Sequence, residues 1–473
     1  MAKKYTRRKF LGQASCAALG STTLLSSLSS LLGTNKLMST SLAAPGDYKA
    51  MVCILLAGGN DSYNMLLPYG ESEYAEYAAT RSDLALPRET LLPITTQTAH
   101  GKSFAVHPSM AEVHQLYQQG NLAFLANVGT LVEPITNEQE FASGLKKLPL
   151  GIYSHSDQIQ QWQTAVPQSR EAIGWGGRMA DLLQETDTTT GISMNISLSG
   201  RNVFQSGQNT LEYSISNRGD GVQGVEDFRR QWDSNAGFLN DLRDRSFKNI
   251  ADKMYANVFQ QTLGNLTGQT LDSIDAFRSA IQQVAPFSHS FGEHYLSQNM
   301  HMVARTIAAN SALGNRRQTF FMTFGGWDHH NEVINNQEYM LGIVSRAVGD
   351  LFAALEEIGL QNQVTLFTIS DFARTLTSNG NGSDHAWGGN VLVAGGSVRG
   401  GDVYGTYPDL NITGNPLMVS RRGNLIPTTA ADEYFAELIR WFGVSPNDLE
   451  IILPNIRNFY SPESGVSPIG FLP

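Results

Sequence analysis

Two apolar runs, each followed within a few residues by a carboxylate, constrain the possible fold of this chain more than any other sequence feature. The run 320–324 ends at a Gly-Gly pair that leads to Asp328, and the run 364–369 is followed by Asp371. Between them, residues 338–358 repeat apolar side chains at the spacing of an amphipathic helix. Strand, helix and strand in this order form a βαβ unit with parallel strands. Side chains that follow such strands gather at the carboxyl edge of the sheet, where α/β proteins place their sites.

Further apolar runs extend this unit into a large sheet. Residues 50–56 are continuously apolar, as expected of a strand buried on both faces, and runs at 122–126 and 390–394 predict two more strands. Helical spacing recurs at 108–119 and 432–442. The sequence therefore predicts a doubly wound, mostly parallel α/β sheet flanked by helices. We expect residues 45–473 to form a single domain, with a mainly helical insertion at about 180–314.

The N-terminus has the pattern of a targeting segment. Residues 6–12 read Thr-Arg-Arg-Lys-Phe-Leu-Gly, a mildly apolar stretch follows, and small residues at 41–44 offer a cleavage site. A basic tail before an amphipathic helix and a membrane anchor are the alternative interpretations. Paired arginines at the start of a chain favour a signal for the twin-arginine export machinery. We therefore expect a signal peptide at 1–44 and a periplasmic or extracellular protein.

Charge and cysteine content exclude several classes of function. Residues 1–44 carry six positive charges and no acidic side chain, so the remainder has a net charge of −16, against −10 for the whole chain. Such an acidic protein is not expected to bind nucleic acid. After the signal, no run of 18 apolar residues predicts a membrane span. Cys53 alone remains outside the signal, so a thiolate metal cluster is not expected.

Acidic and imidazole side chains follow several predicted strands and predict a metal site. Asp61 follows the strand at 50–56, Asp328 and His330 follow the strand at 320–324, and a polar loop carries Asp384-His385. With Asp371, these hard oxygen and imidazole ligands suit a divalent cation such as Zn, Ca, Mg or Mn. His329 competes with His330 for the same role. Asp61 also fits an Asx-turn or a helix N-cap.

A serine at the start of a predicted helix is a candidate nucleophile. Residues 153–158 open a helix, and Ser154 and Ser156 both lie at its first turn. Either is equally a capping residue, and the free backbone N–H groups there could hold an anion. The sequence contains no HExxH or GxSxG pattern, so zincin and α/β-hydrolase interpretations have no support.

Several motifs resemble the exported domain-of-unknown-function family 1501, which is grouped with alkaline phosphatases and sulfatases. They are 56–61, Ser154-His155, Gly174–Arg178, Gly325–His330, Ser370–Thr375, Asp384-His385 and Trp441–Val444. The resemblance implies an alkaline-phosphatase-like fold with a metal-centred esterase site. It implies one metal on Asp328, His330 and His385 and another on Asp61 and Asp371, with the nucleophile between them.

Three positions depart from the pattern that the resemblance implies. Asp371 stands where the family usually has Glu, Phe372 stands where the superfamily has a histidine, and Ser154 lies far beyond the strand at 122–126. The first hypothesis is hydrolysis of phosphate or sulfate esters, with Arg374 or Arg178 steadying the substrate oxygens and serine or water attacking. A catalytically degenerate binding or assembly protein is the second. A phosphomutase or transferase is the third.

Overall fold

The computed structural model describes residues 48–98, 101–183, 191–222 and 258–473, with isolated positions between 242 and 253. In these residues, nine strands form one sheet in the order β11-β5-β10-β9-β1-β8-β6-β7, with β14 beside β5. Strands β8 and β9 both run parallel to β1, whereas β10 runs antiparallel to β9 and β5. The predicted α/β class with a mostly parallel sheet is confirmed.

The described strands and helices have the following bounds. The strands are β1 Lys49–Ala57, β2 Leu66–Pro68, β3 Leu92–Ile94, β4 Phe104–Val106, β5 Leu122–Gly129, β6 Asn195–Ser197, β7 Tyr213–Ser214, β8 Arg317–Gly325, β9 Val364–Ser370, β10 Gly389–Ala394, β11 Val403–Tyr404, β12 Met418–Ser420, β13 Asn424–Leu425 and β14 Thr429–Ala430. The helices are α3 Glu71–Arg81, α4 Ala111–Gln118, α5 Glu138–Ala142, α6 His155–Thr164, α7 Trp175–Leu183, α10 Val258–Gln282, α11 Tyr295–Ala308, α12 Asn310–Leu313, α13 Val333–Glu357, α14 Ala431–Phe442 and α15 Leu449–Ile452.

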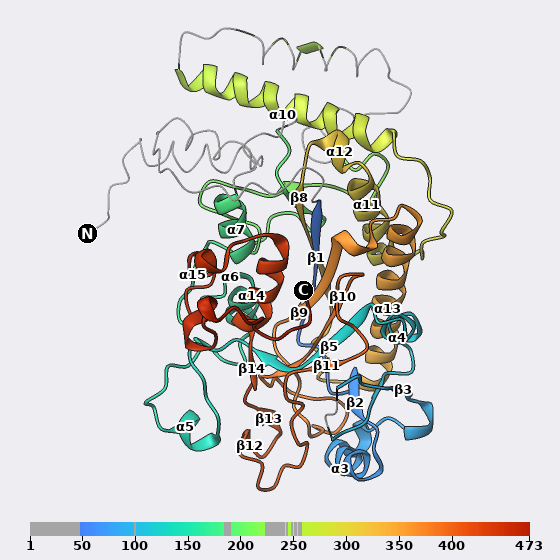
Figure 1. The fold of residues 1–473 in the computed structure, drawn as a ribbon, viewed down its shortest axis with the longest axis vertical. Helices are drawn as coiled ribbons and strands as arrows, with labels where there is room; N and C mark the ends of the chain where they lie inside the picture. Colours follow the sequence, from blue (N-terminus) through green and yellow to red (C-terminus); the bar gives the residue numbers. More distant parts are fainter. Residues whose placement is uncertain are drawn as a thin grey trace, which may run out of the picture.

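Helices cover both faces of the sheet because the central strands are apolar on both sides. In β1, Val52 and Ile54 pack into one core with α4, α11 and α13. Met51 and Cys53 alternate with them and pack into a second core with α6, α7 and α14. Figure 1 shows these two groups of helices on opposite sides of the strands. The doubly wound layering follows directly from this two-sided apolar pattern.

Some of the expected domain organisation lies outside the described residues. This holds for the predicted signal at 1–44 and for most of 223–257 within the predicted insertion. In the described part of that insertion, α10, α11 and α12 are helical and the short strands β6 and β7 extend the sheet beyond β8. Among the described helices, none is both long and apolar enough to span a bilayer.

The register of three parallel strands brings their carboxyl ends level. Ala57 of β1 pairs with Gly325 of β8, and Leu56 pairs with Ser370 of β9. Gly58 follows with φ of 124°, and its N–H donates to the Asp371 carboxylate at 3.0 Å. A Cβ on Gly58 would lie 2.5 Å from the Asp328 backbone nitrogen. Glycine is therefore required here both for the positive φ and for the close approach of β1 and β8.

Replacing Gly58 with alanine should destabilise the fold. The positive φ and the backbone clash together should lower the free energy of unfolding by about 2–4 kcal/mol. Gly380 is a matched control, because its φ is 113° but a Cβ there would meet no atom within 4 Å. Gly380→Ala should cost only about 1–2 kcal/mol. Urea denaturation of both variants measures the difference, and equal losses would contradict the predicted steric contribution.

Candidate metal centre

Three histidine side chains surround the Asp328 carboxylate. His330 Nε2 lies 3.1 Å from Asp328 Oδ1, and His385 Nε2 lies 3.3 Å from the same oxygen. The two Nε2 atoms are 3.1 Å apart. On the other side, His155 Nε2 is 3.4 Å from Asp328 Oδ2. Segments after β8, before β10 and at the start of α6 thus place three imidazole edges around one carboxylate.

Each of these rings has its Nδ1 atom directed at a fixed oxygen. His155 Nδ1 is 2.6 Å from Asp371 Oδ2, His330 Nδ1 is 3.1 Å from Asp384 Oδ1, and His385 Nδ1 is 2.8 Å from the carbonyl oxygen of Tyr153. Tyr153 has a positive φ of 74°, a strained conformation that accompanies this contact of its carbonyl group. In the neutral form of each ring, a hydrogen on Nδ1 satisfies these oxygens, which only accept, and leaves a lone pair on Nε2.

These lone pairs and the Asp328 oxygens fit a divalent cation. Acceptors facing one another at 3.1–3.4 Å repel, unless a positive charge lies between them. Two ligand atoms bound at about 2.0–2.1 Å to a tetrahedral ion are about 3.3 Å apart, close to the observed separations. Histidines whose second nitrogen is held by a carboxylate or carbonyl are also the usual metal-ligand arrangement.

Two overlapping ligand sets share Asp328 and His385. In the first, the Nε2 atom of His330 is the third ligand atom, and the three ligand atoms are 3.1–3.3 Å apart. In the second, His155 completes a group whose ligand atoms all lie within 4.8 Å of one another. The shorter separations favour the set with His330, which leaves His155 beside it.

Arg374 holds Asp328 in its charged form. Its Nη1 donates to Asp328 Oδ1 at 2.7 Å, and its side chain is fully buried. Desolvation raises the pKa of Asp328, but the hydrogen bond and charge of Arg374, with the nearby His330 and His155, outweigh it and lower that pKa overall. The carboxylate is thus ionised and available as a hard ligand at neutral pH.

Asp61 and Asp371 have different partners in the structure. Asp61 is fully buried and forms an ion pair with Arg81 of α3, while its Oδ1 has no partner among the described residues. Asp371 accepts instead from the Gly58 N–H and from His155. Burial raises the pKa of Asp371, although these hydrogen bonds oppose the shift. The two carboxylates implied for a second metal thus each have their own cationic or N–H partner.

Ser154 and Arg178 have contacts away from Asp328. Ser154 caps α6, and its hydroxyl contacts Ser156 at 3.2 Å and the Asp157 carboxylate. The half-buried Arg178 donates to the carbonyl groups of Ile173, at 2.8 Å, and Ile452, at 2.6 and 2.9 Å. Burial lowers its pKa to about 10. Through these bonds Arg178 ties α7 to α15.

Sequence reasoning left open which of two neighbouring histidines joins the site and missed one histidine entirely. His330 lies in the cluster, whereas His329 is buried and burial lowers its pKa. His155 was part of a recognised motif but had no assigned role. Its ring packs against Phe372 and His385, with ring centroids 4.8 Å and 4.4 Å away. Its sequence signals were the Ser154-His155 motif and its position in the first turn of a predicted helix.

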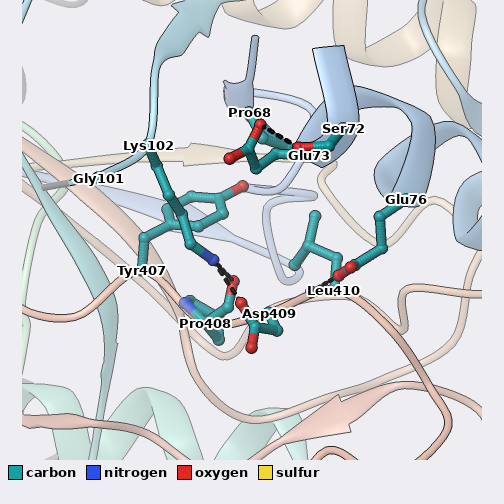
Figure 2. Close-up of a pocket in the computed structure, with 10 residues that line it drawn as sticks. All are labelled: Pro68, Ser72, Glu73, Glu76, Gly101, Lys102, Tyr407, Pro408, Asp409 and Leu410. Atoms are coloured by element: carbon teal, nitrogen blue, oxygen red, sulfur yellow. Dashed lines mark hydrogen bonds and ion pairs between the residues drawn. The ribbon is translucent and has the colours of Figure 1, made fainter. Parts of the chain in front are cut away.

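A separate hollow of about 320 Å³ lies beside α3 (Figure 2). Its ionisable groups are already engaged: Lys102 pairs with Asp409 at 2.6 Å, and Glu76 accepts from the backbone N–H groups of Leu410 and Asn411. These bonds tie α3 to the loop at 407–411. The residues that line the hollow include none of the cluster around Asp328.

Residues 48–421 match the family described as "Protein of unknown function (DUF1501)". The chain belongs to this family. The match includes Asp328, His330 and His385 together with His155, so the whole imidazole cluster of this DUF1501 chain lies within the family region. A search of curated proteins finds no match to it.

Among solved structures, this DUF1501 chain is similar to several enzymes at low identity. The lipoteichoic acid synthase LtaP from Listeria monocytogenes is 9% identical, with 88% of this chain and 78% of that chain covered and a TM-score of 0.32. PsFucS1 sulfatase from Pseudoalteromonas sp. is 10% identical, with 80% and 66% covered and a TM-score of 0.29. TAB5 alkaline phosphatase is 10% identical, with 74% and 91% covered and a TM-score of 0.21. All three scores are below 0.5, and the functional proposal rests on the site alone.

Histidine tautomers provide a direct test of this geometry. His155, His330 and His385 should carry hydrogen on Nδ1, because those atoms face oxygen acceptors. His114 is the matched control, since its Nε2 lies 2.9 Å from the Pro93 carbonyl oxygen and should carry the hydrogen instead. Two-bond nitrogen–proton correlations on histidine-labelled, metal-free protein at neutral pH distinguish these forms. An Nε2–H tautomer at any of the three cluster positions would contradict the arrangement.

Proposed function

We propose that this protein is an exported, metal-dependent hydrolase of phosphate or sulfate esters. The observation that carries the proposal is the convergence of imidazole nitrogens on a carboxylate: Asp328, His330 and His385 hold three possible ligand atoms 3.1–3.3 Å apart. Such a set fits a divalent cation, and the site is accessible, since the Asp328 side chain is 43% exposed. A divalent ion bound there would polarise an ester oxygen and lower the pKa of a nearby hydroxyl or water.

In this proposal, Asp328, His330 and His385 are the ligands and His155 carries the proton. The Nδ1–H of His155 is held by the buried Asp371, as in other sites where a carboxylate orients a catalytic imidazole. The Nε2 atom of His155 faces Asp328 and can accept a proton from the attacking group. Arg374 keeps Asp328 charged and correctly oriented.

Water is the attacking group that the described contacts favour. The hydroxyl of Ser154 is engaged with Ser156 and Asp157, on its own helix. A serine nucleophile at Ser154 or Ser156 would first have to leave these contacts. The same observation favours the second candidate function, a binding or assembly protein that retains the metal centre without turnover.

Export is proposed from the sequence at the N-terminus. The twin-arginine pattern at residues 6–12 is followed by a mildly apolar stretch that ends at small residues. The twin-arginine machinery carries folded proteins, so the metal centre would form before transport. The substrate would then be a small or polymeric ester outside the cytoplasm.

Metal content and turnover of matched variants test this function. The purified protein should contain about one divalent ion per chain by mass spectrometry and release nitrophenol from a phosphate or sulfate ester. Alanine at Asp328, His330 or His385 should lower metal affinity by at least ~10–100-fold. His155→Gln should keep the metal but lower kcat about 10²–10⁴-fold, while the exposed His114→Gln should change neither.

Two outcomes would count against this assignment. Full metal occupancy in His330→Ala and His385→Ala would remove these residues from the ligand set. Stoichiometric metal without release of product from any phosphate, sulfate or phosphonate ester would favour the binding protein over the hydrolase.

Metal retention should extend into acid conditions. Burial is the main cause that lowers the pKa of His385, although the Tyr153 carbonyl and Asp328 oppose the shift. A proton competes with the ion for Nε2, so a lower pKa delays that competition as the pH falls. The metal should therefore stay bound below pH ~6.5, the value for an unperturbed imidazole, and leave at lower pH. Equilibrium dialysis across pH 4–8 measures this, and half-release at or above pH 6.5 would contradict it.

A further inference from the structure

The guanidinium of Arg374, which the sequence suggested as a ligand for the substrate, already donates to protein acceptors. The side chain of Arg374 is completely buried, and its three nitrogens all have protein acceptors. Nη1 donates to Asp328 and, at 3.4 Å, to the Gly58 carbonyl, while Nε and Nη2 donate to the hydroxyl and carbonyl groups of Ser383. Arg374 is therefore a positioning residue for Asp328, and an arginine that contacts an anionic substrate group has to be another one.

Arg422 contacts the same cluster through Asp384. It occupies the turn between β12 and β13, and its side chain is 49% exposed. Its Nη2 forms an ion pair with Asp384 Oδ2, and the other oxygen of that carboxylate lies 3.1 Å from His330 Nδ1. A single carboxylate thus separates the Arg422 guanidinium from a ligand of the proposed metal.

The backbone around Arg422 is fixed even though the side chain is accessible. Its carbonyl accepts from the N–H of Thr377 at 3.2 Å and from the Thr377 hydroxyl at 3.0 Å. Next to it, Asn424 donates to the carbonyl of His385 at 2.8 Å. Hydrogen bonds therefore hold the turn to the segments that carry Thr377 and His385. A fixed backbone limits the conformational entropy that is lost when the guanidinium binds a ligand.

We propose that Arg422 binds the non-bridging oxygens of a phosphate or sulfate ester and makes the site selective for anionic substrates. This rests on the proposed function and names its substrate class. A guanidinium presents paired N–H donors that match the tetrahedral oxyanion, and the contact with Asp384 engages only one edge of it. In a chain with net charge −10, a cationic side chain beside Asp384 also favours the approach of an anion.

A purely structural role for Arg422 makes a different prediction. Desolvation raises the pKa of Asp384, but bonds from Asn379 and His330 and the charge of Arg422 lower it overall. If Arg422 acted only by holding Asp384 against His330, its removal would weaken metal binding first. Anion binding at saturating metal would then be unchanged. Metal affinity and anion affinity must therefore be measured separately.

The test compares Arg422→Gln with Arg421→Gln, which removes an exposed arginine from the same turn. Inorganic phosphate and sulfate are titrated calorimetrically into metal-saturated protein. Arg422→Gln should weaken anion binding at least ~10-fold, about 1.4 kcal/mol, while metal affinity stays within about twofold of the native value. Arg421→Gln should match the native protein, and Arg422→Lys should recover part of the loss. Against an anionic ester, Arg422→Gln should raise KM more than it lowers kcat.

The other possible outcomes either contradict the role of Arg422 or support that role while contradicting the hydrolase function. Native-like phosphate and sulfate binding by Arg422→Gln would overturn it. So would loss of metal from that variant with normal anion affinity once metal is saturating, or absence of measurable anion binding by the native protein. Arg422-dependent phosphate binding in a protein that hydrolyses no ester would support the anion site and reject the hydrolase. Thermal unfolding of each variant verifies that it is folded.

Discussion

The orientation of three imidazole rings is the constraint on which the site depends. Asp371, Asp384 and the Tyr153 carbonyl each hold one Nδ1–H, so His155, His330 and His385 all present lone pairs to Asp328. With a hydrogen on each Nδ1, the Nε2 lone pairs and the Asp328 oxygens repel one another, and a bound cation would relieve this repulsion. The acceptors behind the rings therefore matter as much as the rings themselves, since they decide which nitrogen is free.

The sheet provides the precision that this arrangement needs. Strands β8 and β9 both pair with β1, and their carboxyl ends are level, so Asp328 and Asp371 leave the sheet on the same edge. Gly58 lets the chain after β1 pass against Asp328 and at the same time donate to Asp371. His155 and His385 come from segments that are distant in sequence, and they meet there because α6 packs over one face and the loop before β10 crosses the edge.

The two arginines near Asp328 differ in what they can reach. From its residue type and its place in a motif, Arg374 was expected to bind substrate. In the structure it is buried and donates to Asp328 and Ser383. Arg422 lies outside every motif used in the sequence interpretation, yet its exposed guanidinium is one carboxylate away from His330. Residue type alone cannot distinguish these cases, because accessibility is a property of the folded surroundings.

Local sequence pattern determined the class of fold and the position of several site residues. Apolar runs at 50–56, 320–324 and 364–369 predicted β1, β8 and β9, since continuous apolarity requires burial on both faces. The place of Asp328 and His330 after β8 followed from the same reasoning. Only the tertiary structure decided that Asp61 pairs with Arg81 and that His155 binds Asp371. These partners are distant in sequence, and their meeting depends on helix packing and loop paths that no local periodicity encodes.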